Sequence, residues 1–343
     1  MHTEIIRTEA AWETLSGEWN DLLAESISDV PFLRYEYLRA WWQHRGGGEW
    51  PQAELCIITG RDANGTLLGI APLFITPNNP GKPCIMLLGS VEISDYLDLI
   101  VTLPYLESFV NAVVAHMMRQ DAPEWGCWDW YNVMQSSPTL AALEKAAPEH
   151  NLDFSQAVDQ PAPYVMLPDN IDDYLADLDR KYRNEFRRKM RNAAGFFLPL
   201  SWHIVEEKDK LDSELEAFST LMSQDRHKER FLTDDMRAQM GAIAHALFDS
   251  GMLQLAFLKA GNDYVAAYFN IDYRNRIWVY NSGMDYKFAQ LSPGIVLAGY
   301  LLMDAIEKGR EMVDFMRGDE EYKYQLGGKD KYVMHAVLKK KKA

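Results

Sequence analysis

The sequence predicts an α+β fold built as two tandem domains, each a mixed, mostly antiparallel sheet flanked by helices. The first observation is length, because 343 residues with 48% hydrophobic content exceed one compact core and suit two domains of ordinary size. The second is repetition, because residues 161–343 follow the same order of elements as residues 1–160. We therefore expect an N-terminal domain over residues 1–160 and a C-terminal domain over residues 161–343.

In the first half, apolar residues at helical spacing predict helices, and runs bounded by turn residues predict strands. The expected elements are helices over 8–25, 35–44 and 103–120, a hairpin of 55–59 with 66–75, and strands over 84–88, 96–101 and 128–133. Pro161 and Pro163 then predict a crossover between the domains over residues 150–167.

The second half repeats this order. The expected elements are helices over 170–194, 209–224, 233–249 and 293–308, a hairpin of 253–258 with 264–272, and strands over 276–282, 311–315 and 332–338. The hairpin turn Ala260-Gly261-Asn262-Asp263 carries residues typical of tight turns.

The charge is uneven along the chain. Residues 1–160 carry 8 Lys and Arg against 22 Asp and Glu, whereas residues 161–343 carry 27 against 28. The acidic half repels nucleic acid and anionic membrane, so an anionic ligand is expected on the second half. The longest apolar stretches fall short of the roughly 20 residues needed to cross a bilayer. We expect a cytoplasmic protein without membrane insertion.

The three cysteines, Cys56, Cys84 and Cys127, are scattered along the chain without a CxxC pair. No histidine stands at metal-ligand spacing to them. The sequence therefore predicts small buried side chains at these positions, with neither a disulfide framework nor a metal site.

The segment Ser292-Pro293-Gly294 predicts the start of a helix directly after a strand. Serine is favoured at the N-cap and proline at the first helical position. Gly294 has no side chain, so a bulky anion such as a pyrophosphate can approach the free N–H groups of the first turn. The alternative is a plain N-cap with close helix packing.

Several short motifs around this segment occur together. They are Tyr280, Ser282-Gly283-Met284-Asp285, Phe288-Ala289, Ser292-Pro293-Gly294, Asp314-Phe315, Arg317-Gly318 and Tyr322-Lys323. Together they resemble the GNAT acetyltransferase superfamily, and specifically its CelD/BcsL-type branch, which is associated with cellulose or exopolysaccharide biosynthesis. The resemblance extends to Pro31-Phe32-Leu33 and Trp41-Trp42. It implies a tandem GNAT architecture like that of the Fem-type peptidoglycan transferases.

This resemblance implies acyl-CoA as cosubstrate, with no metal. Its pantetheine would lie between splayed strands at 277–281 and 311–315, and its pyrophosphate at the helix start. The implied donor-binding residues are Tyr280, Asn281, Ser282, Gln290, Leu291, Ser292, Pro293 and Gly294. The superfamily's usual phosphate loop carries two small residues where this chain has a single glycine and a proline. The donor is therefore expected to be acetyl-CoA or another acyl-CoA.

Acylation of an amine needs a base for the ammonium proton and an acid for the leaving thiolate. The candidates are Asp285, Asp314, Glu320 and Tyr322. Three of them have a structural alternative: Asp314 holding Arg317 or loop N–H groups, Tyr322 stacking, and Asp285 stabilising a turn.

Three basic residues are candidates for substrate binding: Arg317, Lys323 and Arg187. Arg317 and Lys323 have the alternative of pairing with residues 319–321. Arg187 belongs to a stripe of Arg180, Arg183, Arg187 and Arg191 along one predicted helix, for which a solvated surface is the alternative. Recognition of tRNA would need a broader basic surface than this acidic chain offers.

These observations predict an acyl-CoA-dependent N-acyltransferase. The acceptor is expected to be the amine of a small molecule, amino sugar or cell-envelope precursor, bound between the domains. One alternative is a Fem-like aminoacyltransferase. The other is a catalytically inactive tandem GNAT binding protein, and the N-terminal domain is the stronger candidate for such a role because it has no Ser-Pro-Gly helix start.

Overall fold

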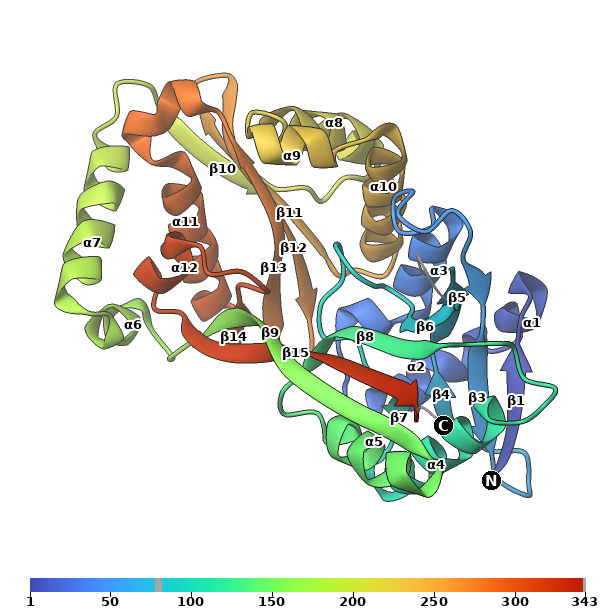
Figure 1. The fold of residues 1–343 in the computed structure, drawn as a ribbon. Helices are drawn as coiled ribbons and strands as arrows, with labels where there is room; N and C mark the ends of the chain where they lie inside the picture. The colour runs from blue at the N-terminus through green and yellow to red at the C-terminus, as the bar shows by residue number, and fades with distance from the viewer. Residues whose placement is uncertain (78–81, 342–343) are drawn as a thin grey trace. The chain divides into compact units, whose positions relative to one another are not determined.

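The computed structural model describes residues 1–77 and 82–341 (Figure 1). The chain divides into two compact units, one of residues 1–160 with 332–343 and the other of residues 161–331. Each unit combines helices with a sheet of mostly antiparallel strands. The predicted α+β class is confirmed. The last strand was expected in the second domain, but most of its residues belong to the first unit because they pair with β8 there.

The first unit opens with β1 and a series of short helices. Its first elements are β1 (His2–Ile6), α1 (Glu9–Glu13), α2 (Ser16–Ala24), η1 (Pro31–Leu33), α3 (Tyr35–Gln43), β2 (Glu54–Leu55), β3 (Ile57–Arg61), β4 (Leu67–Ala71) and β5 (Leu73–Thr76). The remaining elements are β6 (Cys84–Leu87), β7 (Ile100–Val101), η2 (Leu103–Tyr105), α4 (Leu106–Met117), β8 (Cys127–Met134), α5 (Pro138–Glu149) and β15 (Lys329–Lys340).

Two sets of strands form the sheets of this unit. The strands β1, β3, β4 and β7 form an antiparallel sheet in that order. The strands β2, β5, β6, β8 and β15 follow one another in a second sheet, in which only β6 and β8 run parallel among these pairs. The helix expected over residues 8–25 is instead two helices, because Thr14 ends α1 and α2 starts after Leu15.

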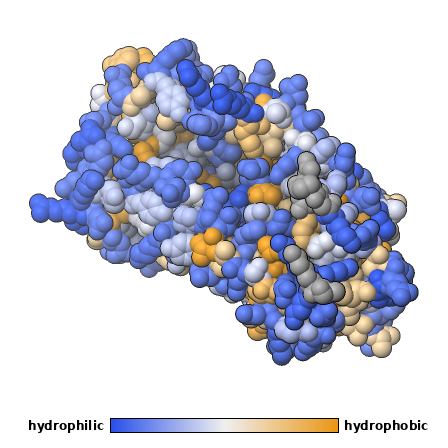
Figure 2. Space-filling model, viewed as in Figure 1, coloured by the Kyte–Doolittle hydropathy of each residue, from blue (hydrophilic) through white to orange (hydrophobic). Residues whose placement is uncertain are grey.

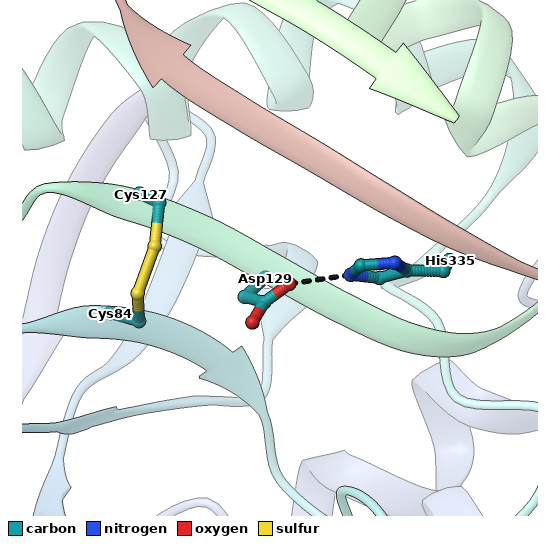
Figure 3. Close-up of a disulfide and its surroundings, with 4 residues drawn as sticks. All are labelled: Cys84, Cys127, Asp129 and His335. Carbon is teal, nitrogen blue, oxygen red and sulfur yellow. Dashed lines mark hydrogen bonds and ion pairs between the residues drawn. A yellow bond between two sulfur atoms is a disulfide. The ribbon is translucent and has the colours of Figure 1, made fainter. Parts of the chain in front are cut away.

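A disulfide joins Cys84 of β6 to Cys127 of β8 (Figure 3). The expectation of unpaired small side chains at these positions was wrong. Parallel pairing of β6 with β8 sets the two residues opposite each other, with their Cα atoms 4.9 Å apart. Because 43 positions separate them in sequence, only this strand pairing brings them together. Cys56 is a free, buried thiol, as expected.

The chain passes from the first unit to the second in β9 (Leu152–Met166). A crossover between the domains was expected over residues 150–167, and the boundary between the units, after Gln160, lies within it. Proline cannot donate a hydrogen bond to a neighbouring strand. Proline still accepts, and the main-chain oxygens of Pro161 and Pro163 accept hydrogen bonds of 2.9 Å from Gly318 and Phe315. At these two positions β9 only has to accept hydrogen bonds, so proline, which has no N–H, fits in the strand.

The second unit contains the elements on which the candidate site is built. Its helices are α6 (Ile171–Asp177), α7 (Arg180–Ala194), η3 (Lys208–Lys210), α8 (Leu211–Met222), α9 (Arg226–Phe231), α10 (Asp234–Asp249), η4 (Tyr286–Leu291), α11 (Pro293–Glu307) and α12 (Glu321–Gln325). Its further strands are β10 (Leu200–Ile204), β11 (Leu253–Ala260), β12 (Asp263–Tyr273), β13 (Arg276–Met284) and β14 (Met312–Asp314). The helix expected over 170–194 is broken because Leu178 and Asp179 are extended.

The sheet of the second unit runs in the order β10, β11, β12, β13, β14, β9. Neighbours are antiparallel except β13 and β14, which are parallel. Its strands are covered on one side by α11 and on the other by α8 and α10 (Figure 1). Alternating side chains such as Tyr268 and Phe269 face opposite sides, with Tyr268 in the cluster around α11 and Phe269 against Phe218 of α8.

No helix in the part of the chain that the structure describes is long and apolar enough to cross a membrane. On the face shown in Figure 2, hydrophilic residues predominate and the apolar residues form small separate groups.

Candidate functional site

The free edge of β13 is the first feature of the site. This strand pairs with β14 only from Arg276 to Trp278, opposite Met312 to Asp314, and then continues to Met284. On its other side it stays paired with β12, where Tyr280 is the extra residue of a bulge between Val279 and Asn281. Beyond Trp278, β14 therefore leaves this side of β13 unpaired, whereas the resemblance implied a gap that begins at residue 277.

On this edge, side chains form hydrogen bonds with the main-chain N–H and oxygen of Ser282. Its N–H donates a hydrogen bond of 2.9 Å to Oδ1 of Asn281, and its oxygen accepts one of 2.6 Å from Nζ of Lys228. Nζ of Lys228 also lies 3.1 Å from Oδ1 of Asn281. Because side chains satisfy both groups of Ser282, no neighbouring strand is needed there.

Sequence reasoning missed Lys228. It lies on α9, whose start is capped by Asp225 accepting from the N–H groups of His227 and Lys228. Burial lowers the pKa of the Lys228 ammonium, while Asp225 and Glu320 act in the opposite direction and Lys323 in the same one. In the sequence, only the Asp225 cap signals a helix here, and nothing singles out Lys228 from the basic residues beside it.

The start of α11 is the second feature. Pro293 is the first helical residue and Ser292 is the N-cap, as predicted, but Ser292 is left-handed (φ 52°) and its side chain makes no capping bond. Only its main-chain oxygen accepts, from the N–H of Val296. A Cβ added at Gly294 would meet only Met284 Sδ, at 3.8 Å, so the first turn is open on that side. Gln290 is exposed and Leu291 is buried.

Asp285 begins the turn that leads from β13 to α11. Its carboxylate accepts a hydrogen bond of 2.9 Å from the N–H of Lys287, at the start of η4. This contact favours the turn-stabilising role over a catalytic one.

Asp314 is fully buried at the end of β14. One carboxylate oxygen forms an ion pair with Lys331, and the other accepts a hydrogen bond of 2.9 Å from the N–H of Met316. The expected bond to a loop N–H is present, and Lys331 is a further partner that the sequence did not predict. Both contacts favour a structural role for Asp314.

Lys323 is also buried, with 2% exposure, and it organises the loop between β14 and α12. Its Nζ donates to the main-chain oxygens of Met316, Arg317 and Gly318, and pairs with Glu320 at 2.8 Å. The ammonium has three protons, so these contacts use its whole donor capacity. They favour structural pairing over substrate binding, and they hold the main chain at Arg317 in place.

Tyr322 and Glu320 are the catalytic candidates whose polar atoms can still form hydrogen bonds with a ligand. The Tyr322 ring packs edge-on against Phe315 at 6.1 Å. Burial, with smaller effects from Tyr268 and Glu320, raises the pKa of the Tyr322 hydroxyl well above its usual value. That hydroxyl has no hydrogen-bond partner among the described residues. The Glu320 carboxylate is more than half exposed.

The structure brings several of the predicted residues close together. Electrostatic interactions link Lys228 of α9 with Glu320 and Lys323, and Glu320 with Tyr322 of α12. Arg187 is exposed on α7, a helix that contacts both η4 and α11. Among residues 1–77 and 82–341, no group of three or more His, Cys, Asp or Glu residues is placed to hold a metal ion.

Comparison with known proteins identifies the domain type. Residues 180–324 match the family model described as an acetyltransferase (GNAT) domain. No curated protein matches the chain significantly. This part of the second unit is therefore similar to GNAT-type acetyltransferase domains, which supports an acyltransferase in general.

Solved structures resemble the whole chain. The structure of FemX has a TM-score of 0.65 at 11% identity, covering 99% of this chain and 96% of FemX. The structure of a conserved protein of unknown function from Bacteroides thetaiotaomicron has a TM-score of 0.62 at 12% sequence identity, covering 99% of this chain and 100% of that one. The structure of the C-terminal domain of a putative lysylphosphatidylglycerol synthetase from Agrobacterium fabrum has a TM-score of 0.52 at 10% sequence identity, covering 95% of this chain and 93% of that one. These identities establish fold alone, and the predicted tandem GNAT-like architecture is confirmed.

Proposed function

We propose that this protein is an acyl-CoA-dependent N-acyltransferase whose donor binds to the second unit. The proposal rests on one observation above all: the edge of β13 that β14 leaves uncovered leads, through η4, to the open first turn of α11. A strand edge offers main-chain hydrogen bonds to the amide groups of pantetheine, and a helix start offers N–H groups to a pyrophosphate.

The proposed donor-binding residues fit these two parts of the ligand. Tyr280, Asn281 and Ser282 form the strand edge, where Asn281 and Lys228 now occupy the groups of Ser282. Gln290, Leu291, Ser292, Pro293 and Gly294 form the phosphate end. Ser292 contributes no side-chain cap, and proline has no N–H, so the N–H groups of Gly294 and Ile295 remain available to an anion.

In the proposed reaction, acyl-CoA supplies an acyl group activated as a thioester. The Glu320 carboxylate accepts a proton from the acceptor ammonium, directly or through water, which frees the amine to attack. As the new C–N bond forms and the C–S bond of the thioester breaks, the protonated Tyr322 hydroxyl donates its proton to the leaving sulfur and regains one from the acylated nitrogen. Asp285, Asp314 and Lys323 hold the turns that carry these groups. Arg317 and Arg187 remain candidates for binding an anionic group of the substrate.

Ligand-induced thermal stabilisation tests the proposal. Free CoA, acetyl-CoA and longer acyl-CoAs are each titrated against the protein, and at 100 times Kd the gain is about 2.7 kcal/mol. No shift with any of them contradicts donor binding.

A glycine variant locates the phosphate end. Gly294→Glu adds a carboxylate where the pyrophosphate is proposed, and we expect CoA stabilisation to disappear through repulsion. Gly241→Glu is the matched control, because Gly241 is also helical, in α10, and a Cβ there meets nothing within 4 Å. If Gly294→Glu binds CoA as tightly as Gly241→Glu, the phosphate site lies elsewhere.

The acceptor is the open part of the proposal. The resemblance to the CelD/BcsL-type branch suggests an amino sugar or a cell-envelope precursor, and a panel of amines tested with several acyl-CoAs identifies it. Stabilisation by aminoacyl-tRNA and not by acyl-CoA would favour a Fem-like aminoacyltransferase. CoA binding without transfer to any amine would favour an inactive binding protein.

A further inference from the structure

The α7 helix carries the densest positive charge on this acidic chain. Between Arg180 and Ala194 it has seven basic residues and a single acidic one, Glu185. The helix packs on α11 through Phe186 and Met190, whose side chains lie against Gly299, and it also contacts η4, while five of its seven basic side chains are exposed. In Figure 1, α7 lies at the edge of the second unit, with α11 on its inner side. The positive charge is thus presented outward.

Only part of this charge is neutralised within the protein. Arg188 and Lys189 both pair with Glu185, and Arg183 donates to the main-chain oxygens of Leu175 and Ala176. Three other arginines, Arg180, Arg187 and Arg191, are exposed and make no ion pair with any described residue. Their spacings of seven and four residues place them on one line along the helix, so their charges add at one surface.

An exposed aromatic side chain follows this helix in the sequence. Phe197 follows the C-cap Gly195 by two residues and is 74% exposed, more than any other large apolar side chain among the described residues. Its ring contacts that of Phe196, with centroids 4.5 Å apart, and Phe196 packs against the core cluster of the unit. The Phe197 ring therefore contacts the protein through Phe196, while most of its surface is exposed to water. The N–H of Gly195 bonds to the oxygen of Arg191, one helical turn earlier, and Phe197 follows Gly195 by two residues.

We infer that α7 and Phe197 form a docking surface for an anionic lipid membrane. Lipid phosphates neutralise Arg180, Arg187 and Arg191, and Phe197 enters the boundary between headgroups and acyl chains. A nucleic acid would also pair with the arginines. Transfer of the exposed Phe197 ring from water into an apolar medium, which a membrane offers, is favourable in free energy. The chain's net charge of −15 repels the same membrane, so the attraction is confined to this surface and orients the protein on it. The inference does not depend on the proposed acyl transfer.

Vesicle flotation with the full chain tests this surface. One set of vesicles contains phosphatidylcholine alone, and the other contains phosphatidylcholine with about one third phosphatidylglycerol. We expect binding to the anionic vesicles only, weakened when the salt concentration is raised from about 0.1 M to 0.5 M because exposed charges are then screened. Equal binding to both vesicle types, or binding to neither, overturns the inference.

Variants separate charge from insertion. Arg187→Gln with Arg191→Gln should lower the partition coefficient about fivefold per arginine, and Phe197→Ser should lower it about tenfold. All three positions are exposed, so the melting temperature should stay within a degree or two. The control pair Lys287→Gln with Lys329→Gln removes two exposed lysines outside α7 and should bind as the wild type does.

The variants also distinguish a membrane from a nucleic acid. If the control pair weakens vesicle binding as much as the arginine pair, the effect is general electrostatics and the α7 surface is excluded. If Phe197→Ser binds vesicles as the wild type does, while a tRNA or single-stranded RNA binds more tightly than the vesicles, the surface is one for nucleic acid and the inference fails.

Discussion

Lys228 of α9 donates a hydrogen bond from Nζ to the main-chain oxygen of Ser282, 2.6 Å away on β13. The same ammonium lies 3.1 Å from Oδ1 of Asn281, which itself accepts from the N–H of Ser282. The Lys228 side chain, from the six-residue helix α9, thus supplies a hydrogen bond on the edge of β13 that β14 leaves unpaired. Lys228 therefore helps to hold the main chain of β13 at Ser282 in place.

Substitution of Lys228 should loosen this edge. Lys228→Met removes the donors and leaves the Ser282 oxygen and Asn281 amide oxygen without them, which we expect to cost about 1 to 3 kcal/mol of unfolding free energy. Amide hydrogen exchange over residues 279–284 should become faster, while Lys287→Met, on exposed η4, should change neither quantity. Unchanged exchange in Lys228→Met would show that β13 holds this edge without α9.

Replacing Tyr322 tests its role as the acid. Tyr322→Phe should keep its stability within about 1 kcal/mol, because its hydroxyl has no hydrogen-bond partner among the described residues. It should leave CoA affinity unchanged and lower kcat at least a hundredfold, the usual contribution of a positioned acid. Tyr268→Phe is the comparison, because burial also raises the pKa of that tyrosine on β12. A loss of kcat in Tyr268→Phe alone would move the acid role to Tyr268.

The sequence predicted the elements whose signals are local. The hairpin of β11 and β12, the strand β13 and the start of α11 at Pro293 lie within a few residues of their expected positions. Turn residues, strand periodicity and proline at the first helical position are all properties of neighbouring residues. The second unit's sheet and the helix start at the site could therefore be predicted.

The contacts that decide which candidates are available could not be predicted. Asp314 pairs with Lys331 across 17 positions, and Lys228 reaches Ser282 across 54. Lys323 folds back on main-chain oxygens, whose positions depend on left-handed Met316 and on Gly318. Such partners are set by tertiary packing, so a charged residue in a motif predicts a site without telling whether its charge is already used.

The disulfide can be checked by counting thiols. Denatured protein without reductant should give one reactive thiol, Cys56, and three after reduction. The native protein should give none, since burial raises the pKa of Cys56 to about 12 and shields it. Cys84→Ser with Cys127→Ser should lower the unfolding free energy by about 2 to 4 kcal/mol, as expected for a loop of this length. Three thiols before reduction would mean that the bond does not form under the conditions of isolation.

Asp98 gives the first unit a pH-dependent stability. Its buried carboxylate accepts from Ser137 and Thr139, both at 2.6 Å, and from the N–H of Leu99 at 2.7 Å. Burial outweighs these hydrogen bonds and raises the pKa of Asp98 to about 6. The folded state therefore binds a proton more tightly than the unfolded one does. Stability from this proton is fully present below pH 4 and is lost as the pH rises through 6.

Asp98→Asn removes this titration. Over pH 4 to 7 the unfolding free energy of the wild type should fall by about 3 kcal/mol relative to that of the variant, from a shift of about two pKa units. Urea unfolding at half-unit pH steps measures the difference. Thr139→Val keeps the shape but removes one donor to Asp98, so it should move the transition to higher pH. Parallel curves for the wild type and Asp98→Asn would show that Asp98 is ionised throughout this range and that its three hydrogen bonds outweigh its burial.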